Sequence, residues 1–174
     1  MKPAAFDYIR AEHLDEALDA IGREGSDARI LAGGQSLMPM LNMRLAKPST
    51  IIDIMRLTEL NRIDSKAGAI TVGAGVRQAS LLDWPDLGRS LRLAALALPW
   101  TGHAQTRSRG TVCGSIAHAD PSAEINVYRP SKSVPARESI FLCAIEVRER
   151  VRNVLEIEPN AAFRKSRSFS APVS

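Results

Sequence analysis

The chain has 174 residues, of which 45% are hydrophobic and 24% charged, a composition that can bury the core of one domain or of two small lobes. Its net charge of +4 does not indicate a nucleic-acid partner, because residues 1–125 carry 14 basic and 14 acidic side chains and the whole chain has only four Phe, two Tyr and two Trp. The apolar segment at residues 93–98 is too short to cross a bilayer and the first residues lack the apolar core of a signal peptide, so we expect a cytoplasmic protein with no membrane partner.

The first part of the chain alternates between strand and helix patterns. The expected elements are a strand at residues 6–9, a helix from Leu14 to a stop at Gly25, strands at 29–32 and 50–54, and a helical segment at 37–41 between those two strands. We predict a small lobe of β-α-β type over residues 1–56.

A different pattern follows, which we interpret as a second lobe over residues 57–125. The expected elements are a hairpin of strands around Ile63 and at 69–72, a helix over 87–98, and a polar loop over 100–110. The segment Gly73-Ala74-Gly75-Val76 resembles the start of a dinucleotide-binding fingerprint, but Gln78 stands where its third glycine belongs and no helical pattern opens there. We therefore reject a Rossmann fold.

The rest of the first lobe is arranged around residues 30–39, where an apolar run breaks into Gly33 and Gly34 before a helical segment. Such a junction leaves backbone N–H groups without intrahelical partners, and the missing Cβ atoms let an anion approach the main chain. A phosphate or pyrophosphate fits this loop. The alternative is an ordinary strand-to-helix turn with Ser36 as N-cap.

A second glycine-rich stretch, residues 110–124, contains two glycines, three hydroxyl side chains and the carboxylates Asp120 and Glu124. Hydroxyls and glycine N–H groups suit phosphate oxygens, and a carboxylate accepts hydrogen bonds from a ribose. Together they favour a nucleotide, although Asp120 is equally typical of a turn before Pro121.

Other chemistries fit the sequence poorly. His118 and Asp120 lack a third metal ligand, and Ser36 lacks the second glycine of a nucleophile elbow. Cys113 and Cys143 have no Cys-x-x-Cys spacing, so this chain's thiols cannot build a zinc site or an iron–sulfur cluster by themselves. Any cluster must belong to a partner, and we interpret Cys113 as a space-filling residue in a small-residue loop.

Two motifs resemble those of a known family. They are Ala32-Gly33-Gly34-Gln35-Ser36-Leu37 and Arg107-Ser108-Arg109-Gly110-Thr111-Val112-Cys113-Gly114-Ser115, the latter followed by Asp120-Pro121-Ser122-Ala123-Glu124. They are similar to the signatures of the FAD-binding medium subunit of molybdenum hydroxylases, which includes the carbon monoxide dehydrogenase flavoprotein and the flavin subunit of xanthine dehydrogenase-type enzymes. The resemblance runs from about Lys2 to Ile125 and implies an α+β fold, the two-lobed vanillyl-alcohol-oxidase (PCMH) type, with FAD extended between the lobes.

The resemblance also implies which residues hold the cofactor. The main chain of Leu31, Ala32, Gly33, Gly34, Gln35, Ser36 and Leu37 would bind the pyrophosphate, Thr111, Gly114 and Ser115 would contact phosphate and flavin, Glu124 would contact the adenosine portion, and Thr101 and Gly102 would line the isoalloxazine end. No side chain is expected to act as an acid or base and no metal is expected, because the flavin supplies the chemistry.

In this family a large subunit hydroxylates the substrate at a molybdenum cofactor, and a small subunit passes the electrons through [2Fe–2S] clusters to FAD on the medium subunit. The resemblance therefore implies an oxidoreductase subunit with an iron–sulfur small subunit and a molybdenum large subunit as partners. A chain without cluster ligands suits the flavin position in this relay.

Two features depart from the family pattern. Cys113 replaces the first glycine of a pair, and after Ile125 the sequence continues differently, with a linker at residues 126–135, an amphipathic helix within 138–158 and a basic, serine-rich end expected to be disordered. We predict a divergent tail over residues 126–174 and an incomplete second lobe. The tail is either the product of a frame change or a genuine alternative end, and the alternative function is a truncated, non-catalytic fragment or assembly protein that binds a partner through this helix.

Overall fold

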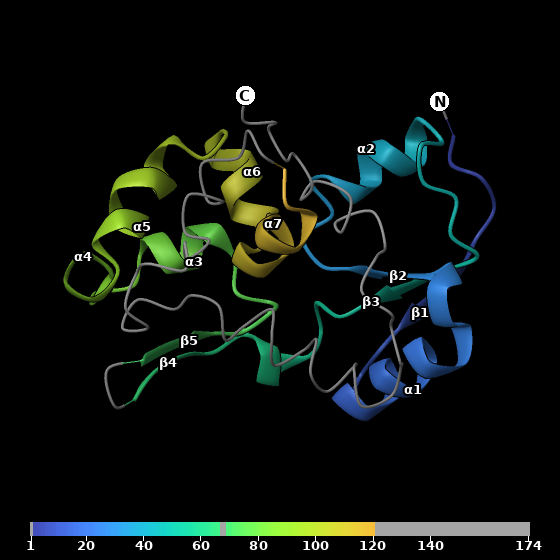
Figure 1. Ribbon diagram of the computed structural model, residues 1–174, viewed down its shortest axis with the longest axis horizontal. Helices are drawn as coiled ribbons and strands as arrows, with labels where there is room; N and C mark the ends of the chain where they lie inside the picture. Colours follow the sequence, from blue (N-terminus) through green and yellow to red (C-terminus); the bar gives the residue numbers. More distant parts are fainter. Residues whose placement is uncertain (1, 67–68, 121–174) are drawn as a thin grey trace, which may run out of the picture.

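The computed structural model describes residues 2–66 and 69–120 (Figure 1). Its elements are β1 (Asp7–Arg10), α1 (Leu14–Glu24), the 3-10 helix η1 (Gly25–Asp27), β2 (Ala28–Leu31), α2 (Leu37–Asn42), β3 (Thr50–Asp53), η2 (Thr58–Leu60), β4 (Ile63–Lys66), β5 (Ala69–Val72), α3 (Gln78–Leu82), α4 (Leu87–Ser90), α5 (Arg92–Ala97), η3 (Leu98–Trp100), α6 (Ala104–Arg109) and α7 (Val112–His118).

The first three strands form a parallel sheet in the order β1-β3-β2, with both Asp7 and Ala28 paired to Thr50. The central strand β3 is buried, and Ile51 and Ile52 are at most 1% exposed, because strands pack on both of its edges. Helix α1 packs against β3, and α2 lies on the other side of the sheet in Figure 1. The strand and helix patterns expected before residue 57 are confirmed.

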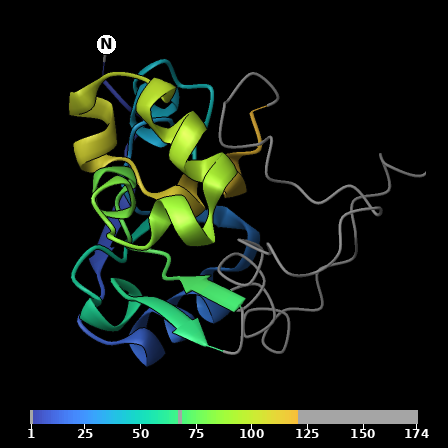
Figure 2. The same cartoon turned by 90° about the vertical axis from the view of Figure 1, so that its left-hand side faces the viewer.

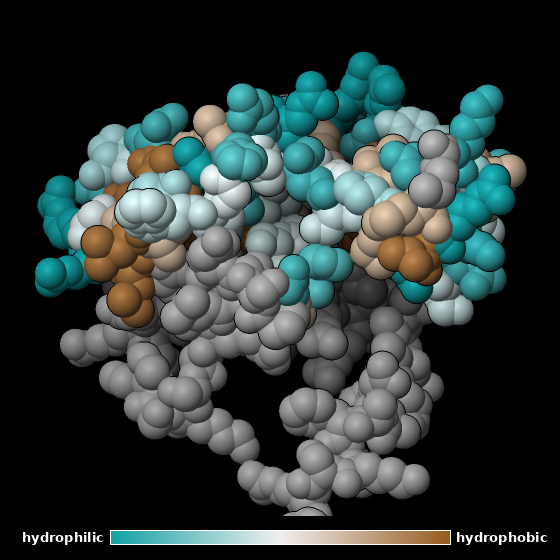
Figure 3. Space-filling model, turned by 90° about the horizontal axis from the view of Figure 1, so that it is seen from above, coloured by the Kyte–Doolittle hydropathy of each residue, from teal (hydrophilic) through white to brown (hydrophobic). Residues whose placement is uncertain are grey.

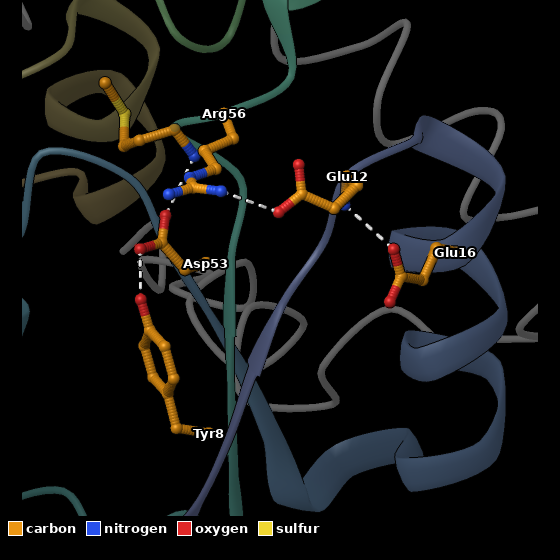
Figure 4. Close-up of polar contacts among 6 residues, drawn as sticks. Tyr8, Glu12, Glu16, Asp53 and Arg56 are labelled. Atoms are coloured by element: carbon orange, nitrogen blue, oxygen red, sulfur yellow. Dashed lines mark hydrogen bonds and ion pairs between the residues drawn. The ribbon is translucent and has the colours of Figure 1, made fainter.

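The carboxyl ends of β1 and β3 are joined by polar side chains (Figure 4). The Tyr8 hydroxyl donates a hydrogen bond to Asp53, whose other carboxylate oxygen accepts one from the Met55 N–H at 2.8 Å. Arg10 lies over the Tyr8 ring, with 5.8 Å between the guanidinium carbon and the ring centroid, and its hydrogen bond to the Tyr8 side chain raises the pKa of Arg10. The Asp53 carboxylate therefore links β1 to the segment that follows β3, and Leu31 at the end of β2 is paired with the same residue.

A second set of contacts holds the start of α1 at the same edge. Arg56 forms an ion pair with Glu12 at 2.9 Å, and the Glu12 N–H donates to a carboxylate oxygen of Glu16 at 2.8 Å (Figure 4). Exposed pairs of this kind contribute roughly 0–1 kcal/mol each. Their effect is mainly to fix the direction of the chain where it leaves the sheet.

The hairpin of β4 and β5 is antiparallel, with Ile63 opposite Val72, as expected from the sequence. Helices α3 to α7 lie together above it in both Figures 1 and 2. After β5 the chain turns tightly against η2, where a Cβ on Gly73 would lie 2.1 Å from the Leu60 carbonyl oxygen. This close approach explains why residue 73 is a glycine, although the segment that it begins resembles a dinucleotide-binding fingerprint.

Four expectations for the second part of the chain are wrong. Helix α3 begins at Gln78, where no helical pattern was expected. The single helix expected over 87–98 is two helices, α4 and α5, separated at Leu91, which has φ −134° and ψ 62°. The break keeps Leu87, Leu91 and Leu98 buried, so the apolar spacing was correct although the helix is interrupted. The loop expected over 100–110 contains α6, and the second glycine stretch opens the helix α7 rather than a loop. Neither α6 nor α7 has an apolar stripe long enough to be recognised.

Large exposed apolar side chains gather in two places, on α5 and η3 and around α2. They are Leu93, Leu96 and Trp100 in the first group and Met38, Met43 and Leu45 in the second. Figure 3 shows brown residues towards the left of the view and to the right of its centre, with hydrophilic side chains between them. Within residues 2–66 and 69–120, no helix has the length and apolar content needed to span a membrane.

Candidate FAD site

The two glycine motifs, far apart in sequence, pack directly on each other. A Cβ on Gly33 would lie 2.4 Å from the Arg109 carbonyl oxygen, 2.6 Å from the Gly110 Cα and 2.9 Å from the Thr111 nitrogen. Real Cβ atoms do not approach a backbone so closely. Gly33 is therefore required by the contact between the motifs, whereas the sequence suggested that its missing Cβ leaves room for an anion.

Hydrogen bonds with residues 76–78, at the start of α3, hold the second motif in this position. The Gln78 N–H donates to the Gly110 carbonyl at 2.9 Å, and the Val112 N–H donates to the Val76 carbonyl at 3.0 Å. Arg77 forms an isolated β-bridge with Thr111, and its guanidinium donates to the Ser108 carbonyl at 2.7 Å. Residues 76–78 thus fix the backbone at the end of α6 and the start of α7.

The loop from Gly33 to Leu37 presents unused backbone donors. Among the described residues, none of the N–H groups of residues 33–37 has an acceptor, and Gly34 adopts φ +69°, a conformation that favours glycine. Ser36 stands at the N-cap position of α2 but makes no side-chain capping bond, so the alternative of an ordinary turn capped by the Ser36 hydroxyl is not supported. Gln35 folds over the loop instead and donates to the Gly33 carbonyl at 3.1 Å.

The second motif is built around a helix cap. The Thr111 hydroxyl accepts a hydrogen bond from the Gly114 N–H at 3.0 Å, and Thr111 is only 2% exposed. A Cβ on Gly114 would lie 2.6 Å from that hydroxyl oxygen. Cys113 is 6% exposed in the first turn of α7, while Ser115 is half-buried. Glu124 lies outside the described residues.

Removing this cap gives a testable prediction. Thr111→Val keeps the shape of the side chain but deletes the acceptor, so we expect the free energy of unfolding to fall by about 1–2 kcal/mol, the usual value of an N-cap. Thr111→Ser retains a hydroxyl and should keep most of the stability. Urea denaturation of the two variants measures the difference, and equal losses in both would refute the capping role.

Thr101 and Gly102 form the turn between η3 and α6. Thr101 is buried at 7% exposure, its hydroxyl donates to the Ala97 carbonyl at 3.2 Å, and Gly102 has φ +54°. The turn is connected to the glycine motifs through α6, which ends where Gly110 packs beside the Gln35 side chain. The structure thus joins Thr101–Gly102 to the motif contact by one short helix.

Gln78 is a site residue that the sequence did not reveal. It is 4% exposed, its side chain packs beside Gly110, and its Oε1 has no hydrogen-bond partner among the described residues. Its only sequence signal is its place at the position of the third glycine in the dinucleotide fingerprint that we rejected.

An unpartnered buried carbonyl oxygen costs about 1–3 kcal/mol. Gln78→Met, which keeps the length of the side chain and removes the polar atoms, is therefore expected to raise the free energy of unfolding by about 1 kcal/mol. Chemical denaturation measures this effect, and a loss of stability would show that the carboxamide has a partner in solution.

The alternative metal interpretation receives no support from the described part of the chain. No group of three or more His, Cys, Asp or Glu residues comes together there in a way that could hold a metal ion. His118 is exposed near the end of α7, one residue before Ala119 in the left-handed conformation.

A parallel sheet whose edge strand runs into a glycine loop, closed by a second glycine motif at the start of a helix, defines an α+β flavin-domain architecture. The chain belongs to the family described as the FAD binding domain in molybdopterin dehydrogenase, which matches residues 4–128. The family and the FAD cofactor expected from the two motifs are confirmed.

Curated relatives are subunits of dehydrogenases. The chain is 38% identical over 162 residues to the 6-hydroxypseudooxynicotine dehydrogenase complex subunit alpha of Paenarthrobacter nicotinovorans, a match that covers 89% of this chain and 55% of the relative. It is 39% identical over 121 residues to the carbon monoxide dehydrogenase medium chain of Hydrogenophaga pseudoflava, covering 70% and 42% of the two chains. These relatives are components of dehydrogenases, in agreement with the class expected from the two motifs.

Solved structures agree with these relatives. Reconstituted CO dehydrogenase from Oligotropha carboxidovorans superposes with a TM-score of 0.71 at 30% identity, over 74% of this chain and 45% of that chain. Quinoline 2-oxidoreductase from Pseudomonas putida 86 gives 0.67 at 38% identity, over 72% and 44%. The expected PCMH-type fold is confirmed, and the chain spans about half the length of the relatives it matches.

Proposed function

We propose that this chain binds FAD as the electron-transfer subunit of a molybdenum hydroxylase-type dehydrogenase. The observation that carries the proposal is the row of backbone N–H groups at residues 33–37, which have no acceptor within the described part of the chain and are held beside the second motif by the Gly33 contact. Five such donors on a loop fit the oxygens of a pyrophosphate. The loop would bind this group, and FAD would supply the redox chemistry.

The remaining site assignments belong to the same proposal. The main chain of Leu31, Ala32 and Leu37 would bind the pyrophosphate together with residues 33–36. Gly114 and Ser115 would contact the phosphate and flavin from α7, Thr101 and Gly102 would line the flavin end, and Glu124 would contact the adenosine portion. Thr111, whose hydroxyl already accepts the Gly114 N–H, would act by fixing the start of α7. The chain positions the cofactor and contributes no acid or base.

The test is direct. The purified chain with FAD should show flavin absorbance after gel filtration and a thermal shift, whereas riboflavin, which lacks the pyrophosphate, should give a much smaller shift. Absence of both signals with FAD would overturn the proposal. Equal shifts with FAD and riboflavin would show that the glycine loop does not hold the pyrophosphate.

The proposal extends to partners and organisation. Electrons would arrive from [2Fe–2S] clusters on a small subunit, with the molybdenum cofactor on a large subunit, in the cytoplasm. Residues 1–56 and 57–125 would form the two lobes, the second incomplete, and residues 126–174 a separate tail. Co-purification with the two subunits would support this arrangement, and a chain that stays alone when all three are co-expressed would contradict it.

A second candidate is an assembly protein that binds a partner through the tail. One observation favours a genuine tail over a frame change, since a match covering 89% of this chain must extend past Ile125 into a subunit of a dehydrogenase complex. Deleting residues 126–174 should then abolish complex formation while the front part stays folded. A complex that survives the deletion rules this function out.

A further inference from the structure

Arg107 reaches back along α6 to the turn that precedes the helix. One of its terminal nitrogens donates to the Thr101 carbonyl at 3.2 Å and to the Gly102 carbonyl at 2.7 Å. Both acceptors belong to the turn in which Gly102 has φ +54°. Hydrogen bonds from a charged donor are about twice as strong as neutral ones.

The turn has few other restraints. The Thr101 N–H donates to the Leu98 carbonyl at 3.1 Å and the Thr101 hydroxyl to the Ala97 carbonyl, so Thr101 is tied to the end of α5. Gly102 is exposed, and its carbonyl has no other donor among the described residues. The orientation of this peptide group therefore depends on Arg107.

The opposite end of α6 is fixed by a separate guanidinium. Arg77 donates to the Ser108 carbonyl at 2.7 Å, next to the contact between the two glycine motifs. Each end of α6 is thus held by hydrogen bonds from a different arginine. Arg77 serves the end at the pyrophosphate loop, and Arg107 serves the end at Thr101 and Gly102.

We propose that Arg107 is a positioning residue for the isoalloxazine ring, acting through the Thr101–Gly102 turn. This inference rests on the proposed function, in which that turn lines the flavin end of FAD. Arg107 itself need not touch the cofactor. Because its hydrogen bonds lie at one end of α6, its loss should affect the flavin portion of FAD and spare the pyrophosphate and adenosine portions.

The experiment compares FAD with ADP, which carries the pyrophosphate and adenosine but no flavin, in the full chain. We expect Arg107→Met to weaken FAD binding about tenfold, which corresponds to roughly 1.4 kcal/mol, and to change ADP binding less than about twofold. The visible circular dichroism of bound flavin should also change. Arg107→Lys, which keeps a charged donor, should restore part of both signals. Arg92→Met, at an exposed arginine on α5 that has no side-chain hydrogen bond or ion pair among the described residues, should alter neither.

The outcomes separate the two proposals. If the native chain binds neither FAD nor ADP, the proposed function fails and this inference fails with it. If the native chain binds FAD and Arg107→Met leaves both the FAD affinity and the flavin dichroism unchanged, only the inference is overturned. Equal losses of FAD and ADP binding in Arg107→Met and Arg107→Lys would likewise overturn it, because they indicate general damage to α6.

Discussion

Gly33→Ala is expected to lower the free energy of unfolding by about 3 kcal/mol and to weaken FAD binding at least about tenfold. The added methyl group would lie 2.4 Å from the Arg109 carbonyl oxygen and 2.6 Å from the Gly110 Cα, both rigid backbone atoms. The two motifs must move apart to admit it, which separates the loop of residues 33–37 from the start of α7. Chemical denaturation and FAD titration measure the two effects.

Gly88→Ala is the matched control for this variant. A Cβ on Gly88, in α4, meets no atom within 4 Å, so the same substitution should be neutral or stabilising by roughly 0.5–1 kcal/mol. If Gly33→Ala were as stable as Gly88→Ala and bound FAD normally, the contact between the motifs would not exist in solution.

Leu98→Ala is expected to cost about 2–5 kcal/mol of unfolding free energy, the range for large-to-small changes in a core. Leu98 is 1% exposed at the junction of α5 and η3, and its carbonyl accepts the Thr101 N–H at 3.1 Å. A cavity at this position loosens the packing beneath the Thr101–Gly102 turn. Thermal and urea denaturation should both show the loss.

The neighbouring Leu96 provides the comparison, because it lies two residues before Leu98, in α5, and is 62% exposed. Leu96→Ala should change the free energy of unfolding by less than about 0.5 kcal/mol. Similar losses in the two variants would mean that residues 92–98 do not present the buried face seen in the structure.

Residues 1–56 and the hairpin of β4 and β5 were predictable from sequence because their signals are local. The helix ending at Gly25, the strands around it and the hairpin at Ile63 each follow from the spacing of apolar residues or from a turn. Helices α6 and α7 were missed because their sequences are polar or rich in small residues. Neither sequence has large apolar residues at the helical spacing that would indicate a buried face. They are stabilised by contacts such as the Thr111 cap and the Arg107 hydrogen bonds, which involve neighbouring segments.

By itself, the sequence determined the family, the cofactor class and the order of the two glycine motifs, because these depend on residue types at fixed short spacings. Only the tertiary structure decided what each glycine is for. Gly33 is a glycine because the backbone of residues 109–111 occupies the place of its Cβ, and Gly34 because of its positive φ. The reason for Gly33 comes from segments distant in sequence that pack together, and so does the role of Gln78, whose N–H donates to the Gly110 carbonyl. The roles of Gly34 and Arg107 depend on the backbone conformation of nearby turns, which the residue types alone do not show.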